Sequence, residues 1–443
     1  MDLIIQNARI IDPYQDIDLV GDIFVKDGLV DHVGPSMDES HSAKRVIKAE
    51  GLIASPGFMD LHCHLRDPGF ESKETIVTGT KAAAKGGFTT ICCMPNTEPP
   101  MDTPAVVQYV KDQAKRASQV RVYPIGCVTK AREGKALSNM YALAQAGVVL
   151  YSDDGSPVHD PDLMRMALAY AGDLGLAISN HCEDPVLSRG GVMHEGEVSI
   201  RLGLPGIPAT AEEIMVARDI ALAENTGGLL HIAHVSTAGS VELVKQAKDR
   251  GLNITAEVTP HHLTMSDFWV AGKTTGENIM DPLTSEAYDT NARVYPPLRS
   301  SADVNAVVEG LRTGIIDCIA TDHAPHDKIS KGGTYEEAEN GISVLETAFG
   351  SLMSLVNNGR IGLAELIERL TIGPARVLGN DFLQFASLKP GTPADIVMLD
   401  PEKEWIVDTK EFLSKGKNTP LHGTKFNGKV VMTLVGGQIV WEE

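Results

Sequence analysis

Short apolar runs that end in polar residues recur at regular intervals through the middle of the chain. Eight such runs lie at 56–65, 88–96, 120–128, 147–154, 176–183, 228–236, 254–262 and 315–326. Between most of them lie stretches with the apolar spacing of helices, including 75–85, 162–171 and 210–224. Strands that alternate with helices pair in parallel through right-handed crossovers. Eight such units predict an α/β fold with a closed (β/α)8 TIM barrel.

The two ends of the chain have a different pattern, in which short runs alternate between apolar and polar residues. They lie at 3–11, 22–26 and 29–33 near the start and at 394–399, 429–435 and 438–441 near the end, with Asp27-Gly28 and Asn427-Gly428 as turn signals. Neither end is long enough to bury a good core alone. We therefore expect both to join in one small β domain, with an amino-terminal part at 1–54, the barrel at 55–385 and a carboxy-terminal part at 386–443.

The amino-acid composition argues against several classes of binding partner. The formal net charge of −20 and the pI near 5.1 argue against nucleic acid, and no run of Lys or Arg indicates a membrane surface. No stretch resembles a signal peptide or a spanning helix. The chain has six cysteines, and those at 63, 92, 93, 127 and 182 lie within predicted barrel strands, where they are better interpreted as small buried side chains than as disulfide partners. We expect a reduced, cytoplasmic setting.

The first predicted barrel strand carries the strongest chemical signal. In Asp60-Leu-His62-Cys-His64-Leu-Arg66 the acid, both histidines and the arginine alternate, so a strand places them on one face. Burying so much imidazole and charge is unfavourable by several kcal/mol unless something pairs with it, and a divalent metal is the obvious partner. The strand predicts a metalloenzyme.

Other predicted strands also end in metal-ligand residue types. The fourth ends in Asp153 and Asp154, of which alternation lets only one face the barrel axis, and spacing alone does not say which. Further candidates are His181, His231, His234 and Asp322. Such a set suits zinc, and a shared carboxylate would let two ions sit roughly 3.5 to 4 Å apart. We interpret His231, His261, His262 and His323 as partners that orient ligands through their other ring nitrogen.

Five motifs in order give the chain a specific resemblance. They are His62-Cys-His-Leu-Arg-Asp-Pro-Gly, Met94-Pro-Asn-Thr, Tyr151-Ser-Asp-Asp-Gly, His231-Ile-Ala-His-Val-Ser-Thr and Ala320-Thr-Asp-His-Ala-Pro-His. They resemble dihydroorotases of the long bacterial form (class I) in the amidohydrolase superfamily. The resemblance implies a barrel joined to a small β-sandwich. It also implies that His62, His64 and Asp322 hold one Zn²⁺, that His181 and His234 hold another where two bind, and that Asp154 bridges them.

The implied reaction is the reversible, zinc-dependent cyclisation of N-carbamoyl-L-aspartate to (S)-dihydroorotate in de novo pyrimidine biosynthesis. A metal lowers the pKa of water from about 15.7 to about 7, and Asp322 can move the proton between that water and the ring nitrogen. Arg66 has the planar fork that matches the substrate carboxylate. Asn96 and His326 are substrate positions in the family, although an ordinary salt bridge for Arg66 and a turn role for Asn96 remain alternatives.

Two features depart from the family pattern. Tyr295 stands before the two prolines where the family usually has an Asn that contacts the ring, so the ring contacts on that side are in question. The segment 327–341 is rich in Lys, Gly and Glu and lacks the proline that the family commonly has near its end. It is interpreted either as a lid over the substrate or as a surface loop.

Other functions fit parts of the same pattern. A hydantoinase or allantoinase would use the same barrel, metals and base, and a non-catalytic scaffold subunit would keep the barrel alone. Arg66, Asn96 and the acidic bridge favour dihydroorotase. We expect a homodimer or larger assembly acting on a small molecule, and because some bacterial dihydroorotases dock onto aspartate transcarbamoylase, an association with that enzyme is a further possibility.

Overall fold

The barrel strands are short and parallel. The computed structural model describes residues 2–35, 43–117, 119–272 and 281–443. Its barrel strands are β6 (Phe58–Cys63), β7 (Phe88–Cys93), β8 (Arg121–Pro124), β9 (Ile178–Asn180), β12 (Leu230–Ile232), β13 (Ile254–Val258) and β14 (Cys318–Ile319). Within this set β6, β7 and β8 pair side by side, as do β9, β12, β13 and β14.

Isolated bridges join these two groups into a ring. Tyr151 bridges in parallel to Gly126 on one side and to Ile178 on the other, and it stands where the fourth strand was expected. Cys63 bridges in parallel to His323, which links the last strand to the first. The prediction of an eight-unit barrel is confirmed, with the fourth strand reduced to a single bridging residue.

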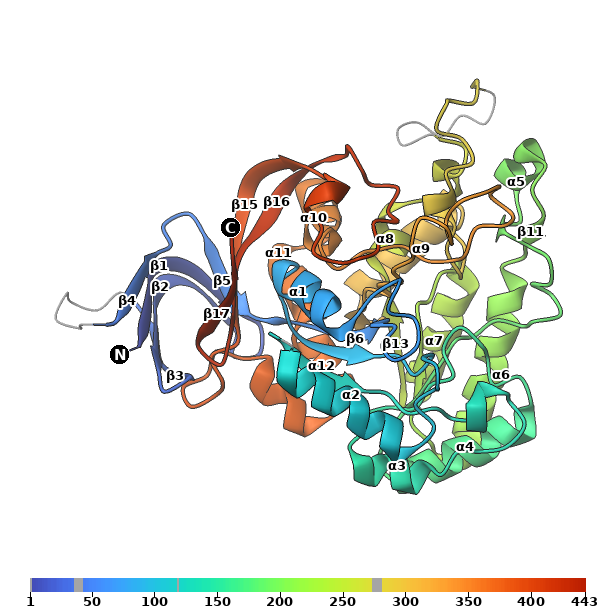
Figure 1. The fold of residues 1–443 in the computed structure, drawn as a ribbon, viewed down its shortest axis with the longest axis horizontal. Helices are drawn as coiled ribbons and strands as arrows, with labels where there is room; N and C mark the ends of the chain where they lie inside the picture. The colour runs from blue at the N-terminus through green and yellow to red at the C-terminus, as the bar shows by residue number, and fades with distance from the viewer. Residues whose placement is uncertain (1, 36–42, 118, 273–280) are drawn as a thin grey trace.

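Helices surround the ring (Figure 1). They include α1 (Ile76–Lys85), α2 (Pro104–Ala117), α3 (Met140–Ala146), α4 (Pro161–Asp173), α6 (Thr210–Thr226), α7 (Ala238–Asp249), α9 (Ser301–Arg312), α10 (Ala348–Asn357), α11 (Leu363–Leu370) and α12 (Ile372–Leu378), with the shorter α5 (Glu197–Leu202) and α8 (Pro260–Thr264) near the rim. Side-chain caps set several starts, since Thr75 accepts from the Thr78 amide and Asp160 from the Leu163 amide. The three helices predicted from the sequence are confirmed, each within three residues at either end.

Both chain termini contribute to a separate sheet. Its strands are β1 (Leu3–Asp12), β2 (Ile17–Lys26), β3 (Leu29–Gly34), β4 (Arg45–Lys48), β5 (Ile53–Pro56), β15 (Ile396–Ile406), β16 (Lys425–Val435) and β17 (Gln438–Glu442). They follow the order β17-β16-β15-β5-β1-β2-β3, with β4 beside β1. The sheet and both chain ends lie to one side of the barrel (Figure 1). The small β domain is therefore built as expected.

The sheet curls around its own core. The Ala394 amide donates to the Gly28 carbonyl at 2.9 Å, and Val30 donates to Thr392, so β3 meets the segment that leads into β15. The enclosed side chains come from both chain ends and include Ile10, Ile23, Met398 and Leu434. Because β5 runs across residues 54 and 55, the division of the chain at 54/55 and 385/386 stays a proposal.

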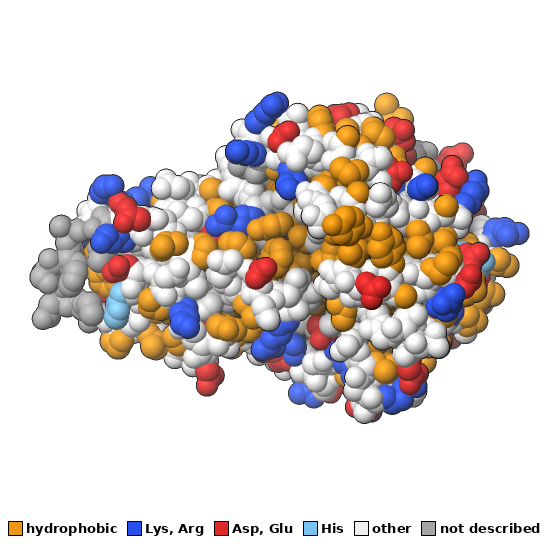
Figure 2. Space-filling view, turned by 90° about the horizontal axis from the view of Figure 1, so that it is seen from below, with side chains coloured by type: hydrophobic (Ala, Val, Ile, Leu, Met, Phe, Trp, Pro, Cys, Tyr) orange, Lys and Arg blue, Asp and Glu red, His pale blue; other side chains and the backbone are white. Residues whose placement is uncertain are grey.

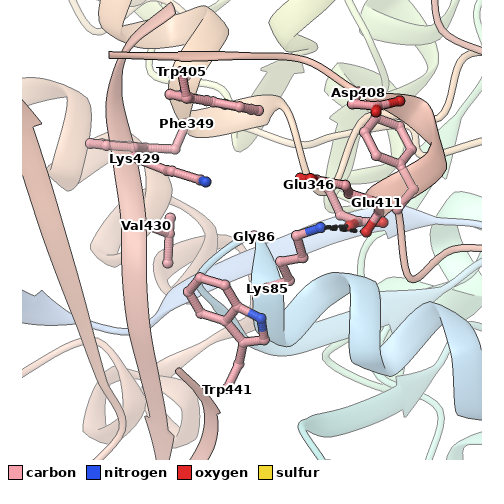
Figure 3. A pocket seen from close by; sticks show the side chains of 12 residues that line it. Lys85, Gly86, Glu346, Phe349, Trp405, Asp408, Glu411, Lys429, Val430 and Trp441 are labelled. Carbon is pink, nitrogen blue, oxygen red and sulfur yellow. Dashed lines mark hydrogen bonds and ion pairs between the residues drawn. The ribbon is translucent and has the colours of Figure 1, made fainter. Parts of the chain in front are cut away.

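The sheet meets the barrel at a small pocket. Lys85 at the end of α1 contacts Glu346 at 2.9 Å, while Trp405 and Trp441 reach toward the same space from β15 and β17 (Figure 3). Phe349 of α10 completes the apolar side. Aromatic and aliphatic burial of this kind joins the two parts without using any of the candidate site residues.

The surface carries mixed charge. On the face drawn in Figure 2, hydrophobic side chains form a band across the middle, and Lys and Arg side chains are scattered among acidic ones. Among the described residues, no helix combines the length and the apolar character needed to cross a membrane.

Candidate metal centre

Six sequence-predicted ligands come together at the carboxyl ends of the barrel strands. His62 lies in β6 and His64 directly after it, Asp154 follows the Tyr151 bridge, and His181, His234 and Asp322 follow β9, β12 and β14. All six are buried, with no more than 5% of any residue exposed. His234 and Asp322 have φ values of 34° and 45°, a backbone conformation that is unfavourable for non-glycine residues. The fold thus holds these two side chains in place against local strain.

Asp154 lies at the centre of the group. Its Oδ1 is 3.3 Å from His62 Nε2, 3.5 Å from His234 Nε2 and 3.7 Å from His181 Nδ1. Its Oδ2 is 3.5 Å from His64 Nε2. The two oxygens of one carboxylate therefore face different histidines, which is the arrangement a bridging ligand requires.

The neighbouring Asp153 is used elsewhere. Its carboxylate accepts hydrogen bonds from the amides of Val128 and Thr129 at 2.9 and 3.1 Å, and from the Thr129 hydroxyl. It therefore ties the third strand end to the fourth. Of the two adjacent acids, the structure turns Asp154 toward the histidines.

Asp322 lies on the other side of His62 and His64. Its Oδ1 is 3.0 Å from His64 Nε2 and 3.5 Å from His62 Nε2. Burial raises the pKa of Asp322, but His62 and His64 lower it well below its usual range. Burial likewise raises the pKa of Asp154, and the surrounding histidines outweigh it. The neighbouring histidines thus hold both carboxylates in the ionised form.

Several buried polar atoms of this cluster have no hydrogen-bond partner among the described residues. Among the described residues, His62 Nε2, Asp154 Oδ1, His181 Nε2 and His234 Nδ1 are buried and make no hydrogen bond. Unsatisfied buried polar atoms are unfavourable by about 1–3 kcal/mol each. Among the described residues, three compact groups could surround an ion. Two of them contain His62, namely His62, His64 and Asp322, and His62, Asp154 and His234, and the third is His231, Glu257 and Cys318. The donor set of imidazoles and carboxylates suits a divalent metal cofactor.

Sequence reasoning missed Glu257, whose carboxylate contacts His62 of the cluster. Its Oε1 is 2.7 Å from His62 Nδ1 and its Oε2 is 3.1 Å from His231 Nε2. Burial raises the pKa of Glu257, but His62 and His231 lower it to about 2. Such a carboxylate fixes the tautomer and orientation of a ligand histidine. The available signal was an acid inside the buried strand β13, which is unfavourable without a partner.

Three of the four remaining histidines at the strand ends have structural partners. His231 Nδ1 lies 2.8 Å from the Thr255 hydroxyl, and His262 Nε2 lies 3.0 Å from the Pro296 carbonyl. His323 Nδ1 accepts from the Val344 amide at 3.0 Å. Within the described part of the chain the His261 ring makes no hydrogen bond. Only His231 has the indirect link to a candidate ligand that the sequence suggested, and it acts through Glu257.

A cavity of about 440 Å³ opens above the cluster and contains the predicted substrate residues Arg66, Asn96 and His326. The half-buried Arg66 side chain lines the cavity, and its guanidinium donates to the Pro325 carbonyl at 3.4 Å and lies 3.5 Å from His326 Nε2. Asn96 Oδ1 is 2.9 Å from His64 Nδ1, so this amide also orients a candidate ligand. The cavity therefore has a cationic wall beside the metal-ligand residues.

Tyr295 closes another side of the cavity. Its ring stacks on His181 with centroids 4.9 Å apart and planes 21° apart, and its hydroxyl donates to Ser188 Oγ at 3.1 Å. The tyrosine thus packs against a candidate ligand and presents its ring, rather than an amide, to the cavity.

The loop 327–341 covers the mouth, where residues 337–341 line the cavity. Lys331 anchors it from inside, because its buried ammonium donates to the carbonyls of Arg293, Glu339 and Gly341 at 3.1, 2.7 and 3.2 Å. The position over the cavity is the one expected of a lid.

Comparisons with known proteins agree with this geometry. A family model described as dihydro-orotase-like matches residues 51–240. The chain is 45% identical over 443 residues to a dihydroorotase of Syntrophus aciditrophicus, covering all of both chains, and 47% identical over 444 residues to a dihydroorotase of a Thermoanaerobacter species, covering all of this chain and 98% of the relative. Among solved structures, an L-hydantoinase (dihydropyrimidinase) of Arthrobacter aurescens matches all of this chain over 96% of its own, with a TM-score of 0.86 and 26% identity. The chain belongs to the dihydroorotase family.

Proposed function

We propose that this protein is a dihydroorotase, a hydrolase of a cyclic amide C–N bond that interconverts dihydroorotate and N-carbamoyl-L-aspartate in pyrimidine biosynthesis. The observation that carries the proposal is the position of the cationic Arg66 wall directly beside the buried carboxylates and histidines, in one cavity. A substrate with a carboxylate next to a hydrolysable ring amide fits that pair of features. The full-length similarity to dihydroorotases supports the same reaction.

The residues that would hold the metal are His62, His64, Asp154, His181, His234 and Asp322, with Asp154 between two ions where two bind. The cofactor we propose is zinc, one or two per subunit, because imidazole and carboxylate donors suit it. When bound, the ion supplies a Lewis acid that polarises the ring carbonyl and lowers the pKa of water. Glu257 and Asn96 orient His62 and His64 for that role.

The proposed catalytic residue is Asp322, which acts as general base and then as general acid. In the hydrolytic direction its carboxylate accepts a proton from the attacking water as the new C–O bond forms. The ring C–N bond then breaks, and Asp322 returns the proton to the departing nitrogen, which becomes the terminal amine of the carbamoyl group. Ring closure follows the same steps in reverse. The lowered pKa of Asp322 keeps it ready to accept the proton at neutral pH.

The substrate carboxylate is proposed to bind Arg66 and His326, with Asn96 beside them. The planar guanidinium can hold a carboxylate through two hydrogen bonds, and its partial burial strengthens each of them. Tyr295 would pack against the ring where relatives place an amide. We also propose a cytoplasmic enzyme that forms a homodimer or larger assembly, and association with aspartate transcarbamoylase as a further interaction.

The deciding experiment follows dihydroorotate ring opening by zinc-loaded protein, with a chelated sample alongside. Metal-dependent turnover supports the proposal. Asp322→Asn keeps the size of the side chain, so it should lower turnover by at least about a hundredfold, in keeping with the loss of a general base. Retained turnover in a variant with unchanged zinc content would contradict the role of Asp322.

A hydantoinase-like enzyme is the second candidate, because the solved structures that resemble this chain over its full length include L- and D-hydantoinases. Parallel assays with dihydroorotate and with an uncharged hydantoin separate the two. Preference for the uncharged ring would favour this second candidate, since Arg66 would then have no carboxylate to bind.

A further inference from the structure

A carboxylate of the protein itself lies at the cationic wall of the cavity. Glu339, near the end of the 327–341 loop, places Oε2 3.1 Å from His326 Nδ1 and 2.5 Å from Lys73 Nζ. The next residue contacts the same ring, since His326 Nε2 lies 2.8 Å from the Asn340 carbonyl. Both ring nitrogens of His326 therefore face the loop, and Arg66 lies 3.5 Å from one of them.

This arrangement occupies the ring that a bound anion needs. His326 Nε2 is hydrogen-bonded to the loop at the Asn340 carbonyl, and the Glu339 carboxylate stands 3.1 Å from Nδ1 without a hydrogen bond to it. The negative charge of Glu339 also acts on Arg66. Burial lowers the pKa of the Arg66 guanidinium, and nearby carboxylates, Glu339 among them, raise it. A second carboxylate entering the cavity meets both a repulsive charge and an occupied partner.

We propose that Glu339 is a specificity-determining residue that competes with the substrate carboxylate for the subsite formed by Arg66 and His326. The inference rests on the proposed function, because it assumes that the substrate brings a carboxylate to this wall. An anionic ring binds only after the Glu339 carboxylate leaves His326 for solvent. An uncharged ring can enter without displacing it.

The loop is built so that Glu339 can move while the loop stays in place. The Glu339 side chain is half exposed, whereas the loop is anchored through buried Lys331, whose ammonium contacts only backbone carbonyls of residues 293, 339 and 341. Rotation of the Glu339 side chain therefore breaks the ion pair with Lys73 and the contact with His326, and none of the Lys331 hydrogen bonds. The exchange of one carboxylate for another at His326 needs no opening of the barrel.

The test compares Glu339→Gln with Glu336→Gln in the zinc-loaded full chain. Both variants remove one negative charge from the same loop, but Glu336 is exposed and does not line the cavity. For E339Q we expect the KM for dihydroorotate to fall about three- to tenfold, which corresponds to roughly 1 kcal/mol of relieved repulsion between two carboxylates. E336Q should leave KM within twofold of the wild-type value.

An uncharged ring supplies the second arm of the test. The KM or inhibition constant of dihydrouracil, which has the same ring without the carboxylate, should be equal in E339Q and wild type. An unchanged or raised KM for dihydroorotate in E339Q overturns the inference, and so does an equal fall in E336Q. Failure of the proposed function looks different, because the wild-type protein would then not turn over dihydroorotate at all.

Discussion

Glu257 links two histidines of the barrel interior, and only one of them faces the candidate metal site. Because its carboxylate accepts from His62 Nδ1, it holds the proton on that nitrogen and leaves Nε2 free to bind a metal. Replacement by an amide of the same size keeps the packing but removes the negative charge. The side chain therefore acts on metal affinity through His62.

We predict that Glu257→Gln weakens zinc binding about 10- to 100-fold, the usual effect of losing such a partner. Competition against a chelator of known affinity measures this directly. Glu74→Gln is the matched control, since Glu74 is also a buried carboxylate beside a histidine, His323, and among the described residues it belongs to none of the groups that could hold a metal ion. Equal zinc affinity in E257Q and wild type would show that His62 needs no such support.

Glu339 should remain charged across the working pH range. The contact with His326 lowers its pKa, burial opposes that effect and Lys73 adds to it, giving a value of about 2 against an ordinary 4.5. A carboxylate whose pKa is lowered by folding stabilises the folded state fully above its unfolded-state pKa, and this stabilisation is lost as the pH falls through its folded-state pKa. The negative charge of Glu339 is therefore fully present above about pH 4.5 and is lost toward pH 2.

From this we predict that the ratio of KM values for wild type and E339Q is constant between pH 6 and 9. Steady-state kinetics at several pH values in that range measure the ratio. A ratio that changes tenfold across neutral pH would mean that a different titrating group controls access of the anion, and Glu339 would not be that group.

At the level of elements, the 327–341 loop depends on one buried lysine. The three protons of the Lys331 ammonium match the three carbonyl acceptors around it. Removing the ammonium leaves buried carbonyls without donors, which is unfavourable by about 1–3 kcal/mol for each one that water does not reach. The loop should then open more often.

Lys331→Met should therefore speed amide hydrogen exchange in residues 327–341 by about tenfold or more, since 1.4 kcal/mol corresponds to a factor of ten. Exchange followed by mass spectrometry resolves this segment. Lys328→Met is the control, because Lys328 lies on the same loop and is exposed. Equal protection in K331M and K328M would show that the loop is held by other contacts.

The order of elements was predictable because apolar runs with polar ends report buried parallel strands. The fourth strand was only partly predictable, because a single residue, Tyr151, forms both β-bridges there. Alternation did not decide between Asp153 and Asp154, because the turn after Tyr151 directs Asp153 to the amides of residues 128 and 129. Those contacts are tertiary and leave no trace in local spacing.

The candidate site, like the fold, was predictable from the sequence only in part. The ligand types at the strand ends were visible because a buried imidazole or carboxylate needs a partner wherever it occurs. Glu257 lies within a strand rather than at its end, so a search of strand ends passed over it. The contact between Glu339 and His326 joins a loop to a strand end, and only the folded chain shows it.

On the scale of the whole molecule, the barrel places six buried groups from five strand ends against one another. This is unfavourable for the protein alone, because several of their polar atoms have no hydrogen-bond partner in the described part of the chain. A metal ion that binds only the folded state stabilises it by RT ln(1 + [L]/Kd), about 2.7 kcal/mol at a hundredfold excess over Kd. Metal content should therefore control the stability of the entire barrel.

We predict that chelation lowers the unfolding temperature of the protein by several degrees and that added zinc restores it, as measured by differential scanning calorimetry. The gain from zinc should be smaller in E257Q than in wild type at equal free zinc, because weaker binding reduces the same logarithm. Lys328→Met, which touches none of the ligands, should keep the full gain. Equal unfolding temperatures with and without zinc would mean that the six side chains reach their positions without a metal, and the cluster would then need a different explanation for its unsatisfied atoms.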